Sequence, residues 1–335
     1  MYRNDGGGVF TQIKTGALPE LTSNSTGLAW GDYDNDGYLD LFVCRLENTF
    51  QNPLPSFLFH NNGDGTFTQV QQSPFTDDTG FATSCSWGDY DNDGWLDLIV
   101  SNYATGGNNR LYHNNGDGTF TRVLSGSVAT DLGNSAAAIW GDYDRDGFLD
   151  LFISNGTAAD GESSDFLYHN NGNSNSWITI KCIGTRSNRS AIGTKVRTES
   201  VIGGKTVKQL REINTGDGWS QNPLEVHFGL GDATNVALIR IEWPSGTVQE
   251  LHNVPAKQFL TVQEPPRIQL ILSSGLPLLL LQGGRGIAYD LEQSKDLVSW
   301  ATTGTLMATN FTGTVQFTVP AQPASSALFY RAASR

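Results

Sequence analysis

Three aspartate-rich stretches recur in the first half of this 335-residue chain, and each leads into an apolar run. They read WGDYDNDGYLDLFV (30–43), WGDYDNDGWLDLIV (87–100) and WGDYDRDGFLDLFI (140–153). A second block follows each of them: LFHNNGDGTFTQV from Leu58, LYHNNGDGTFTRV from Leu111 and a shortened LYHNNGNSNSWITI from Leu167. This internal repeat constrains the fold more than any single segment does, because every copy has to form the same supersecondary unit.

Each copy is predicted to contain four short strands. The first strand ends at Trp-Gly, the aspartate loop turns the chain, and the apolar run forms the second strand. Leu-aromatic-His forms the third strand, Asn-Asn-Gly-Asp-Gly makes a tight turn that favours positive φ, and Thr-Phe-Thr begins the fourth. Four-stranded units that repeat about every fifty residues are typical of the blades of a β-propeller.

The first residues, MYRNDGGGVFTQI, match only the last two strands of such a unit. The predicted fold class is therefore all-β: a partial β-propeller of about three and a half four-stranded blades, followed by two small β domains. We expect the propeller part to be the C-terminal portion of a longer propeller. Closure of the ring by self-association is the less favoured alternative.

The aspartate loops predict calcium sites. Counted from the first aspartate of a loop, carboxylates stand at positions 1, 3, 5 and 9, glycine at position 6 permits a sharp turn, and position 7 offers its backbone carbonyl. Such an oxygen-only shell suits Ca²⁺, which takes about six to eight ligands, whereas softer metals prefer Cys or His. The predicted ligands of three Ca²⁺ ions, with position 7 contributing only its carbonyl, are Asp32, Asp34, Asp36, Tyr38, Asp40, Asp89, Asp91, Asp93, Trp95, Asp97, Asp142, Asp144, Asp146, Phe148 and Asp150.

Comparison of the three copies supports this interpretation. The four aspartates never vary, whereas position 7 is Tyr, Trp or Phe and position 4 is Asn or Arg. Ordinary polar turns are the alternative, but uncompensated carboxylates a few ångströms apart repel by about 1 kcal/mol per pair even in water. An EF-hand is excluded, because the twelfth position is Val or Ile rather than Glu. We therefore predict a structural role, in which each ion holds its turn rigid.

The charge of the chain is unevenly distributed. Residues 1–172 contain 23 acidic and 6 basic residues, whereas residues 173–335 contain 11 and 15. An acidic half disfavours nucleic acid and anionic membranes as partners, because both need clustered cations. The longest apolar run, at 278–281, is far too short for membrane insertion. The three cysteines show no metal spacing and are interpreted as small strand residues.

The DxDxDGxxD loops and the blocks around them resemble the FG-GAP/VCBS repeats of integrin α-chain propellers and of many secreted bacterial proteins. The resemblance covers residues 1–172, and it implies the ligand set given above for each loop. The Phe-Gly and Gly-Ala-Pro elements are absent, so the VCBS branch matches better than the integrin branch.

Four later segments resemble the ASPIC/UnbV domain, which follows such repeats in the cartilage acidic protein family. They are SNRSAIGTKVRTES (187–200), QLREINTGDGWSQN (209–222), VHFGLGDA (226–233) and IRIEWPSGTVQEL (239–251). After Pro265-Pro266, YDLEQSKDLVSW (289–300) and LFYRA (328–332) resemble the C-terminal β-sandwich modules of large secreted bacterial proteins. The predicted domains are therefore the repeats at 1–172, an ASPIC/UnbV domain at 173–264 and a C-terminal module at 267–335.

No catalytic motif was found: the chain contains no GxSxG elbow, HExxH, phosphate loop or CxxC. His60, His113 and His169 recur at one strand position and are interpreted as packing or turn-support residues. We predict a non-enzymatic, calcium-stabilised extracellular protein that acts in binding or adhesion. The alternative is an accessory or substrate-binding part of a secreted carbohydrate-active hydrolase or lyase.

The partner is predicted to be an extracellular protein or glycan. The loops between the second and third strands vary most (45–56, 101–109 and 154–165), and variable loops on a rigid frame often bind ligands. Plain connectors are the alternative. Residues 181–211 carry eight basic residues and one acid, which suggests either a polyanion site or, as the favoured interpretation, a solvated hairpin or docking on the acidic repeats.

An extracellular or cell-surface location follows from the Ca²⁺ sites, which fill readily outside the cell, and from the family resemblance. No signal peptide opens this chain, and one is expected upstream.

Overall fold

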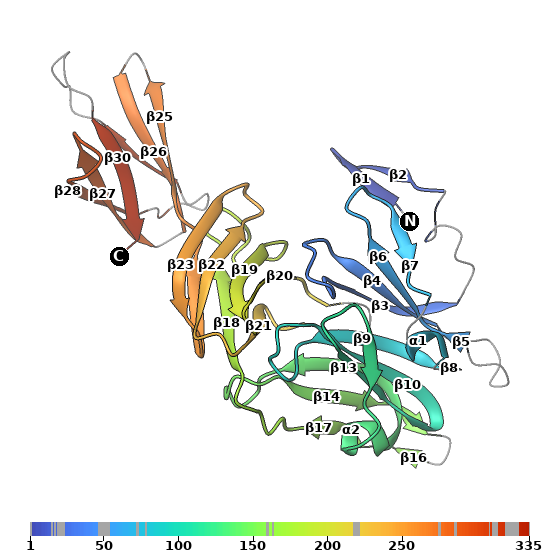
Figure 1. The fold of residues 1–335 in the computed structure, drawn as a ribbon. Helices are drawn as coiled ribbons and strands as arrows, with labels where there is room; N and C mark the ends of the chain where they lie inside the picture. Colours follow the sequence, from blue (N-terminus) through green and yellow to red (C-terminus); the bar gives the residue numbers. More distant parts are fainter. Residues whose placement is uncertain are drawn as a thin grey trace. The chain divides into compact units, whose positions relative to one another are not determined.

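A computed structural model of the chain (Figure 1) describes residues 2–14, 16, 18, 24–45, 54–71, 74–77, 79–158, 161–162, 164–216, 222–273, 276–284, 287–307, 309, 314–318 and 328–334. Within these residues the regular structure is almost entirely strand, and the helices are the single turns α1 (Pro74–Asp77) and α2 (Ser127–Thr130). The prediction of an all-β chain is confirmed. Neither of these short helices is long or apolar enough to cross a membrane.

The chain divides into two compact units, which are described separately. Unit one comprises Met1–Thr179, Val196–Ile239 and Leu251–Phe259, and unit two comprises Ile180–Lys195, Arg240–Glu250 and Leu260–Arg335.

Repeats 1 and 2 each contain four antiparallel strands in unit one; those of repeat 1 form a sheet of their own, and those of repeat 2 belong to a seven-stranded sheet that continues into repeat 3. Repeat 1 has the order β3-β4-β6-β7, with β3 (Ser25–Gly31), β4 (Asp40–Arg45), β6 (Phe57–Asn61) and β7 (Phe67–Gln69). Repeat 2 has the order β9-β10-β11-β12, with β9 (Ala82–Gly88), β10 (Asp97–Asn108), β11 (Arg110–Asn114) and β12 (Phe120–Arg122). The four strands predicted for these copies are confirmed. The predicted half-unit before them is the hairpin β1 (Tyr2–Gly6) and β2 (Val9–Gln12).

Repeat 3 has three strands among the described residues, and here the expected fourth strand is missing. The sheet consists of β13 (Leu132–Gly141), β14 (Asp150–Asn155) and β17 (Phe166–Tyr168), while the next segment, β18 (Ser176–Ile183), pairs with β21 and β24 instead. The turn differs at the same point. Gly65 and Gly118 close the turns of repeats 1 and 2 with φ of 89° and 85°, which L side chains rarely adopt, and Ser174 stands at this place in repeat 3.

The predicted binding loops are only partly visible. Residues 46–53 of the first loop, and 159–160 and 163 of the third, lie outside the described residues. The second, 101–109, is a strand rather than a free loop up to Asn108, because it continues β10 and pairs with β13, for example Tyr103 with Asn134. Two short pairs complete this region: β5 (Leu54–Pro55) with β8 (Thr79–Gly80), and β15 (Thr157–Ala158) with β16 (Gly161–Glu162).

The rest of the chain forms further sheets. The sheets β21-β18-β24 and β20-β19-β22-β23 contain residues of both units, and the sheets β25-β26-β29 and β28-β27-β30 belong to unit two. The strands are β19 (Lys195–Ile202), β20 (Lys205–Glu212), β21 (Glu225–Gly231), β22 (Asn235–Glu242), β23 (Val248–Pro255), β24 (Gln258–Gln263), β25 (Arg267–Ser273), β26 (Leu276–Gln282), β27 (Ala288–Ser294), β28 (Ala301–Met307), β29 (Thr314–Thr318) and β30 (Phe329–Ser334).

Successive repeats pack against one another through an apolar layer. Phe42 of repeat 1 packs with Leu98 of repeat 2, and Ile99 of repeat 2 packs with Ile153 of repeat 3; all four are fully buried. Burial of a side chain of this size contributes about 1.5–3 kcal/mol to stability. The cysteines Cys44, Cys85 and Cys182 are buried and free, as expected for small strand residues.

An indole hydrogen bond recurs at both junctions between repeats. Trp87 Nε1 donates to the carbonyl of Ala29 in the preceding repeat at 3.2 Å, and Trp140 Nε1 donates to the carbonyl of Ser86 at 3.1 Å. Each tryptophan therefore anchors its repeat to the one before it.

An amide hydrogen bond accompanies the indole. Asn114 Nδ2 donates to the carbonyl of Tyr33 at 2.8 Å, and Asn170 Nδ2 donates to the carbonyl of Tyr90 at 2.7 Å. The same tyrosine rings stack on the indoles of the following repeats, with 6.3 Å between ring centroids at both junctions. The two junctions are thus built alike.

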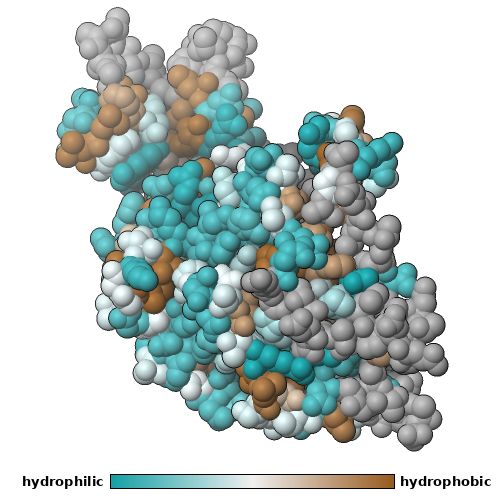
Figure 2. All heavy atoms as spheres, turned by 45° about the vertical axis from the view of Figure 1, so that its right-hand side comes forward, coloured by the Kyte–Doolittle hydropathy of each residue, from teal (hydrophilic) through white to brown (hydrophobic). Residues whose placement is uncertain are grey.

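The visible surface in Figure 2 is mostly hydrophilic, and its hydrophobic residues gather in separate patches.

Candidate metal centres

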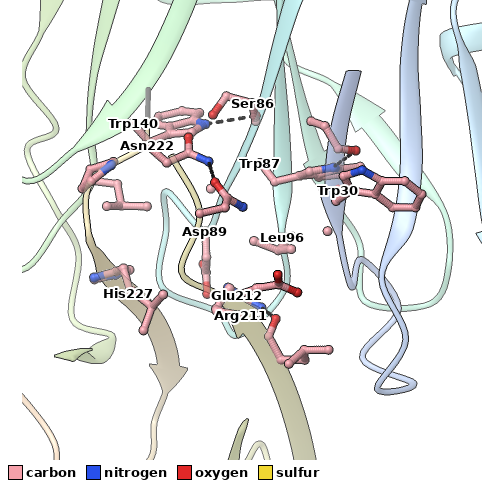
Figure 3. Close-up of a pocket in the computed structure, with 18 of the residues that line it drawn as sticks. Trp30, Ser86, Trp87, Asp89, Leu96, Trp140, Arg211, Glu212, Asn222 and His227 are labelled. Atoms are coloured by element: carbon pink, nitrogen blue, oxygen red, sulfur yellow. Dashed lines mark hydrogen bonds between the residues drawn. The ribbon is translucent and has the colours of Figure 1, made fainter. Parts of the chain in front are cut away.

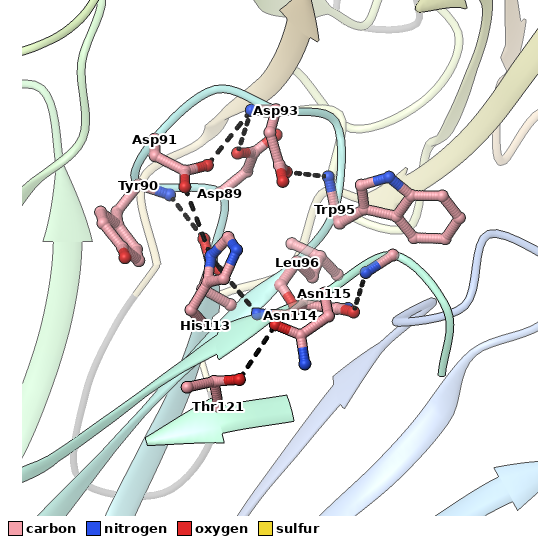
Figure 4. A network of polar contacts seen from close by, with 12 residues as sticks. Asp89, Tyr90, Asp91, Asp93, Trp95, Leu96, His113, Asn114, Asn115 and Thr121 are labelled. Atoms are coloured by element: carbon pink, nitrogen blue, oxygen red, sulfur yellow. Dashed lines mark hydrogen bonds and ion pairs between the residues drawn. The ribbon is translucent and has the colours of Figure 1, made fainter. Parts of the chain in front are cut away.

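Each aspartate loop connects the first and second strands of its repeat and turns through left-handed backbone twice. In the second loop (Figure 4), Asn92 at position 4 has φ of 59° and Gly94 at position 6 has φ of 99°. The corresponding residues of the other loops, Asn35, Gly37, Arg145 and Gly147, have φ between 58° and 93°. Glycine adopts this conformation freely and Asn does so more easily than most residues, which explains the glycine in every loop and the Asn in two.

The first and last aspartates of each loop are held by backbone N–H groups. Asp89 is 1% exposed and accepts a hydrogen bond from Gly94 N at 2.9 Å. Asp97 is fully buried and accepts from Tyr90 N at 3.1 Å and Asn114 N at 2.9 Å. The same contacts recur at Asp32, Asp40, Asp142 and Asp150. These carboxylates fix the conformation of the loop, and the last aspartate also binds the end of the third strand of its repeat.

The histidines of the third strands face the loop carboxylates, which the sequence interpretation missed. His113 Nδ1 lies 3.3 Å from Asp91 Oδ2 and 3.2 Å from Asp97 Oδ1 (Figure 4). His60 and His169 make the same two contacts, at 3.0–3.5 Å, with Asp34, Asp40, Asp144 and Asp150. These contacts agree with the interpretation as turn-support residues, although the sequence did not identify the carboxylates as their partners. Their recurrence at one position of every copy was the available signal.

The loop carboxylates lie close enough to share one cation. Oxygens of Asp32, Asp34 and Asp40 lie within 4.8 Å of one another, and so do oxygens of Asp89, Asp91 and Asp93. Because Ca–O distances are about 2.3–2.6 Å, two oxygens on one Ca²⁺ ion lie at most about 5 Å apart. The acidic groups could therefore hold a metal ion, and their oxygen atoms fit Ca²⁺.

The pKa values of these carboxyl groups are raised. Burial raises the pKa of Asp97 to about 7, although a hydrogen bond with His113 opposes the rise. Burial raises the pKa of Asp40 to about 8, and burial together with the charge of Asp91 raises that of Asp93 to about 6. The charged forms are therefore disfavoured, and a cation among the oxygens would relieve the cost.

The side chain at position 7 has a packing role, which explains why this position is aromatic in all three loops. A Cβ atom built on Gly116 would lie 2.8 Å from the Trp95 ring, and Gly63 and Gly172 are covered in the same way by Tyr38 and Phe148. The ring thus covers the glycine of the Asn-Asn-Gly turn in its own repeat. A ligand role for the carbonyl of position 7 remains a prediction.

Position 4, which varies between copies, connects one loop to the next. Asn35 Nδ2 donates to the carbonyl of Gly94 at 3.0 Å, and Asn92 Nδ2 donates to the carbonyl of Gly147 at 3.0 Å. Arg145 stands at this place in repeat 3, where its guanidinium lies 3.8 Å from the centre of the Phe259 ring. The change from Asn to Arg thus coincides with the end of the series of repeats.

Strand β21 covers the second loop within unit one. Gly229 approaches so closely that a Cβ atom there would lie 2.0 Å from Asp89 Oδ2, so only glycine fits. Asn92 uses its Nδ2 for Gly147, so its Oδ1 accepts from His227 Nε2 at 2.6 Å, and His227 Nδ1 then accepts from the hydroxyl of Thr179 at 2.9 Å. Burial, assisted by the charge of Arg211, lowers the pKa of His227 to about 3, so the imidazole is neutral.

Two residues of the basic segment face the acidic loops of unit one. Arg197 Nη1 donates to the carbonyl of Gly37 at 3.1 Å. The charge of Arg211 opposes the burial that raises the pKa of Asp32 to about 7. These contacts agree with the interpretation that part of the basic segment docks on the acidic repeats.

A cavity of about 130 Å³ lies beside the second loop in unit one (Figure 3). Its lining includes the indoles of Trp87 and Trp140 and the polar side chains of Arg211, Asn214 and Asn222. Among the labelled residues, Asp89 and His227 line it from the loop and from β21 (Figure 3).

Comparisons with known proteins agree with this architecture. Residues 1–43, 51–100 and 89–153 match the model of the FG-GAP-like repeat, and residues 184–269 match the model named ASPIC and UnbV. Cartilage acidic protein 1 of Homo sapiens is 26% identical over 295 residues, which cover 84% of this chain and 43% of that protein. The Mus musculus protein is 27% identical over 256 residues, which cover 73% and 38%. The chain thus spans less than half the length of these curated relatives.

A solved structure described as a Ca²⁺-stabilized adhesin that helps an Antarctic bacterium bind ice aligns with 11% identity over 94% of this chain and 98% of that chain. Its TM-score of 0.12 is too low to carry an argument. The matches to the two family models show that the chain contains FG-GAP-like repeats followed by an ASPIC and UnbV domain.

Proposed function

We propose that the three aspartate loops bind one Ca²⁺ ion each through the ligands predicted from the sequence, and that the ions stabilise a part of a β-propeller. The observation that carries this proposal is the cluster of acidic groups at the same place in three loops, in each of which the last aspartate (Asp40, Asp97 or Asp150) is buried. The ion supplies positive charge among these oxygens, and the chain itself contributes the turn, the buried oxygens and the third-strand histidine beside them.

We further propose that repeats 1 to 3 are propeller blades, preceded by the half-blade β1-β2. The like junctions between them support this. The ASPIC/UnbV domain at 173–264 and a C-terminal β-sandwich at 267–335 complete the proposed organisation.

The proposed activity is non-enzymatic binding or adhesion outside the cell. It rests on the domain content, on the calcium proposal and on the absence of a known catalytic motif from the sequence. The partner would be an extracellular protein or a glycan, and residues 101–109 and the neighbouring second-to-third-strand loops remain the proposed contact surface.

Calorimetry tests the calcium proposal. Titration of Ca²⁺ into chelator-treated protein should release or take up heat until three ions are bound per chain, and should raise the melting temperature. Asp36→Asn, Asp93→Asn and Asp146→Asn should each remove one ion without changing the spectrum of the folded protein. No heat and no change in melting temperature would refute the proposal.

Replacement of the histidines identifies the kind of ion. His113→Gln should leave the stoichiometry of Ca²⁺ unchanged, because the oxygens provide the shell. If the loops preferred a softer metal, such as Zn²⁺, this variant would lose its binding while Asp93→Asn retained part of it.

The cavity beside the second loop favours one alternative function. Indoles together with amide and guanidinium groups offer an apolar face and hydrogen bonds, the kind of lining that small-molecule sites have, in a cavity smaller than the usual ligand pocket of about 300–1,000 Å³. The chain would then be the substrate-binding part of a carbohydrate-active hydrolase or lyase. Screening a glycan array for binding, and the same glycans for turnover, separates this alternative from protein adhesion.

A further inference from the structure

The second aspartate loop is enclosed by other parts of unit one, although its sequence is nearly that of the other two loops. Asn92 at its position 4 is fully buried, whereas the counterpart Asn35 is half-buried and Arg145 is exposed. Asp89 at its position 1 is buried as well. Two segments far along the chain make this enclosure.

Strand β21 is the first of these segments. Gly231 N donates to the carbonyl of Asn92 at 2.8 Å, and His227 Nε2 donates to Asn92 Oδ1 at 2.6 Å. A Cβ atom on Gly229, which stands between these two residues, would lie 2.5 Å from the Cα atom of Asn92. Gln209 Nε2 of β20 donates to the carbonyl of Gly229 at 2.8 Å and holds β21 in this place. Alternate residues of β21 therefore contact the loop.

The turn of repeat 3 is the second segment. Asn173 Nδ2 and Asn175 Nδ2 donate to the carbonyl of Asp91 at 2.6 and 2.9 Å. Repeats 1 and 2 have Asp64 and Asp117 at the place of Asn173, and these carboxylates accept hydrogen bonds inside their own turns. A carboxylate cannot donate to a carbonyl, so the change from Asp to Asn in repeat 3 suits the contact with the second loop.

The groups that make these contacts alternate with the predicted calcium ligands. The carbonyls of Asp91 and Asn92 bind the two segments, while carboxylate oxygens of Asp89, Asp91 and Asp93 lie within 4.8 Å of one another (Figure 4). One backbone conformation of the loop therefore serves both sets of groups. Uncompensated carboxylates oppose this conformation by about 1 kcal/mol per pair even in water, whereas a cation among them favours it.

The first and third loops have weaker contacts with residues 196–239. Arg197 Nη1 donates to the carbonyl of Gly37 in the first loop at 3.1 Å. In the third loop, Arg145 pairs with Glu225 at 4.0 Å, and its side chain is 57% exposed. Such a surface pair contributes little. The second loop is thus the one whose backbone is bound directly by β21.

We propose that Ca²⁺ in the second loop controls the packing of β21 on the repeats, so that β21 docks when the ion is bound and is released when it is removed. This inference rests on the proposed calcium sites and extends the role of one ion from its own turn to a distant segment. An ion shifts such an equilibrium by its differential affinity, and the docked state is the one that holds the three carboxylates together. By reciprocity, the contacts of β21 raise the affinity of this loop for Ca²⁺ by the same factor.

Hydrogen exchange of the full chain tests the proposal, because the Gly231 amide donates directly to Asn92 of the loop. Removal of Ca²⁺ by a chelator should speed the exchange of this amide by at least about tenfold, a coupling within the usual range. In Ca²⁺-containing buffer, Asp93→Asn should have the same effect. Asp36→Asn and Asp146→Asn, which each remove an ion from another loop, are the matched controls and should leave this amide protected.

Calorimetry measures the coupling in the opposite direction. His227→Phe keeps a ring that stacks on Trp177 but removes the hydrogen bond to Asn92. The affinity for one of the three ions should fall by about five- to tenfold, and the other two affinities should not change. His252→Phe, at an exposed position, is the control and should bind all three ions like the wild type. Circular dichroism confirms that each variant is folded.

The outcomes separate this inference from the proposed function. Absence of Ca²⁺ binding in calorimetry would overturn both. Three bound ions, together with a Gly231 amide whose exchange does not respond to the chelator, would overturn the inference and leave the calcium sites intact. An equal effect of Asp36→Asn and Asp93→Asn on this amide would also overturn it, because the control of β21 would then not belong to the second loop.

Discussion

Glu264 in unit two is fully buried, and the backbone of three consecutive residues donates to its carboxylate. Thr185 N, Arg186 N and Ser187 N lie 2.9, 2.8 and 2.7 Å from Oε2, and the hydroxyl of Ser245 donates to Oε1. Burial alone would raise the pKa of Glu264, but these hydrogen bonds outweigh it, and the pKa is lowered. The charged carboxylate therefore contributes to the stability of unit two.

Glu264→Gln should lower the free energy of unfolding by about 2 kcal/mol at pH 7, because the variant loses hydrogen bonds to a charged acceptor. The folded pKa lies below the unfolded value of about 4.3, so the contribution is complete above that value and is lost as the pH falls through the folded pKa. Urea unfolding at pH 7 and at pH 3 should show the difference between wild type and variant shrinking at low pH.

The matched control is Glu250→Gln. Glu250 is exposed and pairs with Arg240 at 2.7 Å, and such a surface pair contributes little. A loss at Glu250 as large as that at Glu264, or a difference at Glu264 that grows as the pH falls, would contradict this account.

At the scale of residues, the sequence predicted the acidic groups but not all of their neighbours. A run of carboxylates at fixed spacing is visible without a structure, because its electrostatic cost is local. The approach of His113 to Asp91 depends on how the third strand crosses the loop, and no rule of local spacing contains it. Position 4 was interpreted as unconstrained because it varies, whereas Asn35 and Asn92 adopt positive φ and bind the following loop.

At the scale of elements, the aspartate loop combines backbone conformation with contacts to its neighbours, and Asn92 allows these two to be separated. Asn92→Gly removes the side-chain hydrogen bonds to Gly147 and His227 and keeps the freedom to adopt φ of 59°. Asn92→Ala removes the same bonds and adds the cost of left-handed backbone, about 1–2 kcal/mol.

We therefore expect Asn92→Ala to unfold at a lower urea concentration than Asn92→Gly, and both to be less stable than the wild type. Equal stability of the two variants would show that the backbone of this loop is not strained by a Cβ atom. Asn35→Gly and Asn35→Ala, in a more exposed loop, should show the same order of stability with smaller losses of stability relative to the wild type.

The order of strands in repeats 1 and 2 could be predicted because alternation, apolar runs and turn residues are local signals. The departure of β18 from repeat 3 could not be predicted with the same ease, since its new partners β21 and β24 lie far along the chain. The replacement of the second turn glycine by Ser174 was nevertheless visible in the sequence, and it coincides with the missing fourth strand. The extension of β10 to Asn108 likewise depends on pairing with β13.

At the scale of the whole molecule, the three loops differ in their cover although their sequences are nearly the same. Gly229 and His227 of β21 lie against the second loop, whereas Asp144 and Asp146 of the third loop are exposed. An ion in the second loop should therefore exchange most slowly.

Terbium, bound in place of Ca²⁺, provides the measurement. Trp95 at position 7 of the second loop can sensitise Tb³⁺ luminescence. The third loop has a phenylalanine at this position but lies against the Trp177 indole at Gly147, so its ion should contribute a separate, fast phase. After addition of a chelator, the luminescence excited through tryptophan should contain a slow phase that is lost in Trp95→Phe. A fast, single decay in the wild type would show that β21 does not retain the ion.

This cover of the second loop was not predictable from the sequence. The fold of the repeats could be predicted because the same sequence pattern occurs in each copy. The packing of residues 196–239 within unit one, in contrast, depends on long-range contacts without a repeated pattern. The excess of basic residues near Arg197 was the one indication, and it left docking and anion binding as alternatives.

The amide links from Asn35 to Gly94 and from Asn92 to Gly147 join the three loops in series. An ion that orders one loop also orders the asparagine that reaches into the next, so occupancy should spread along the row as a one-dimensional cooperative process with a Hill coefficient above one. Arg145 interrupts the row, and the transmission of order should stop there.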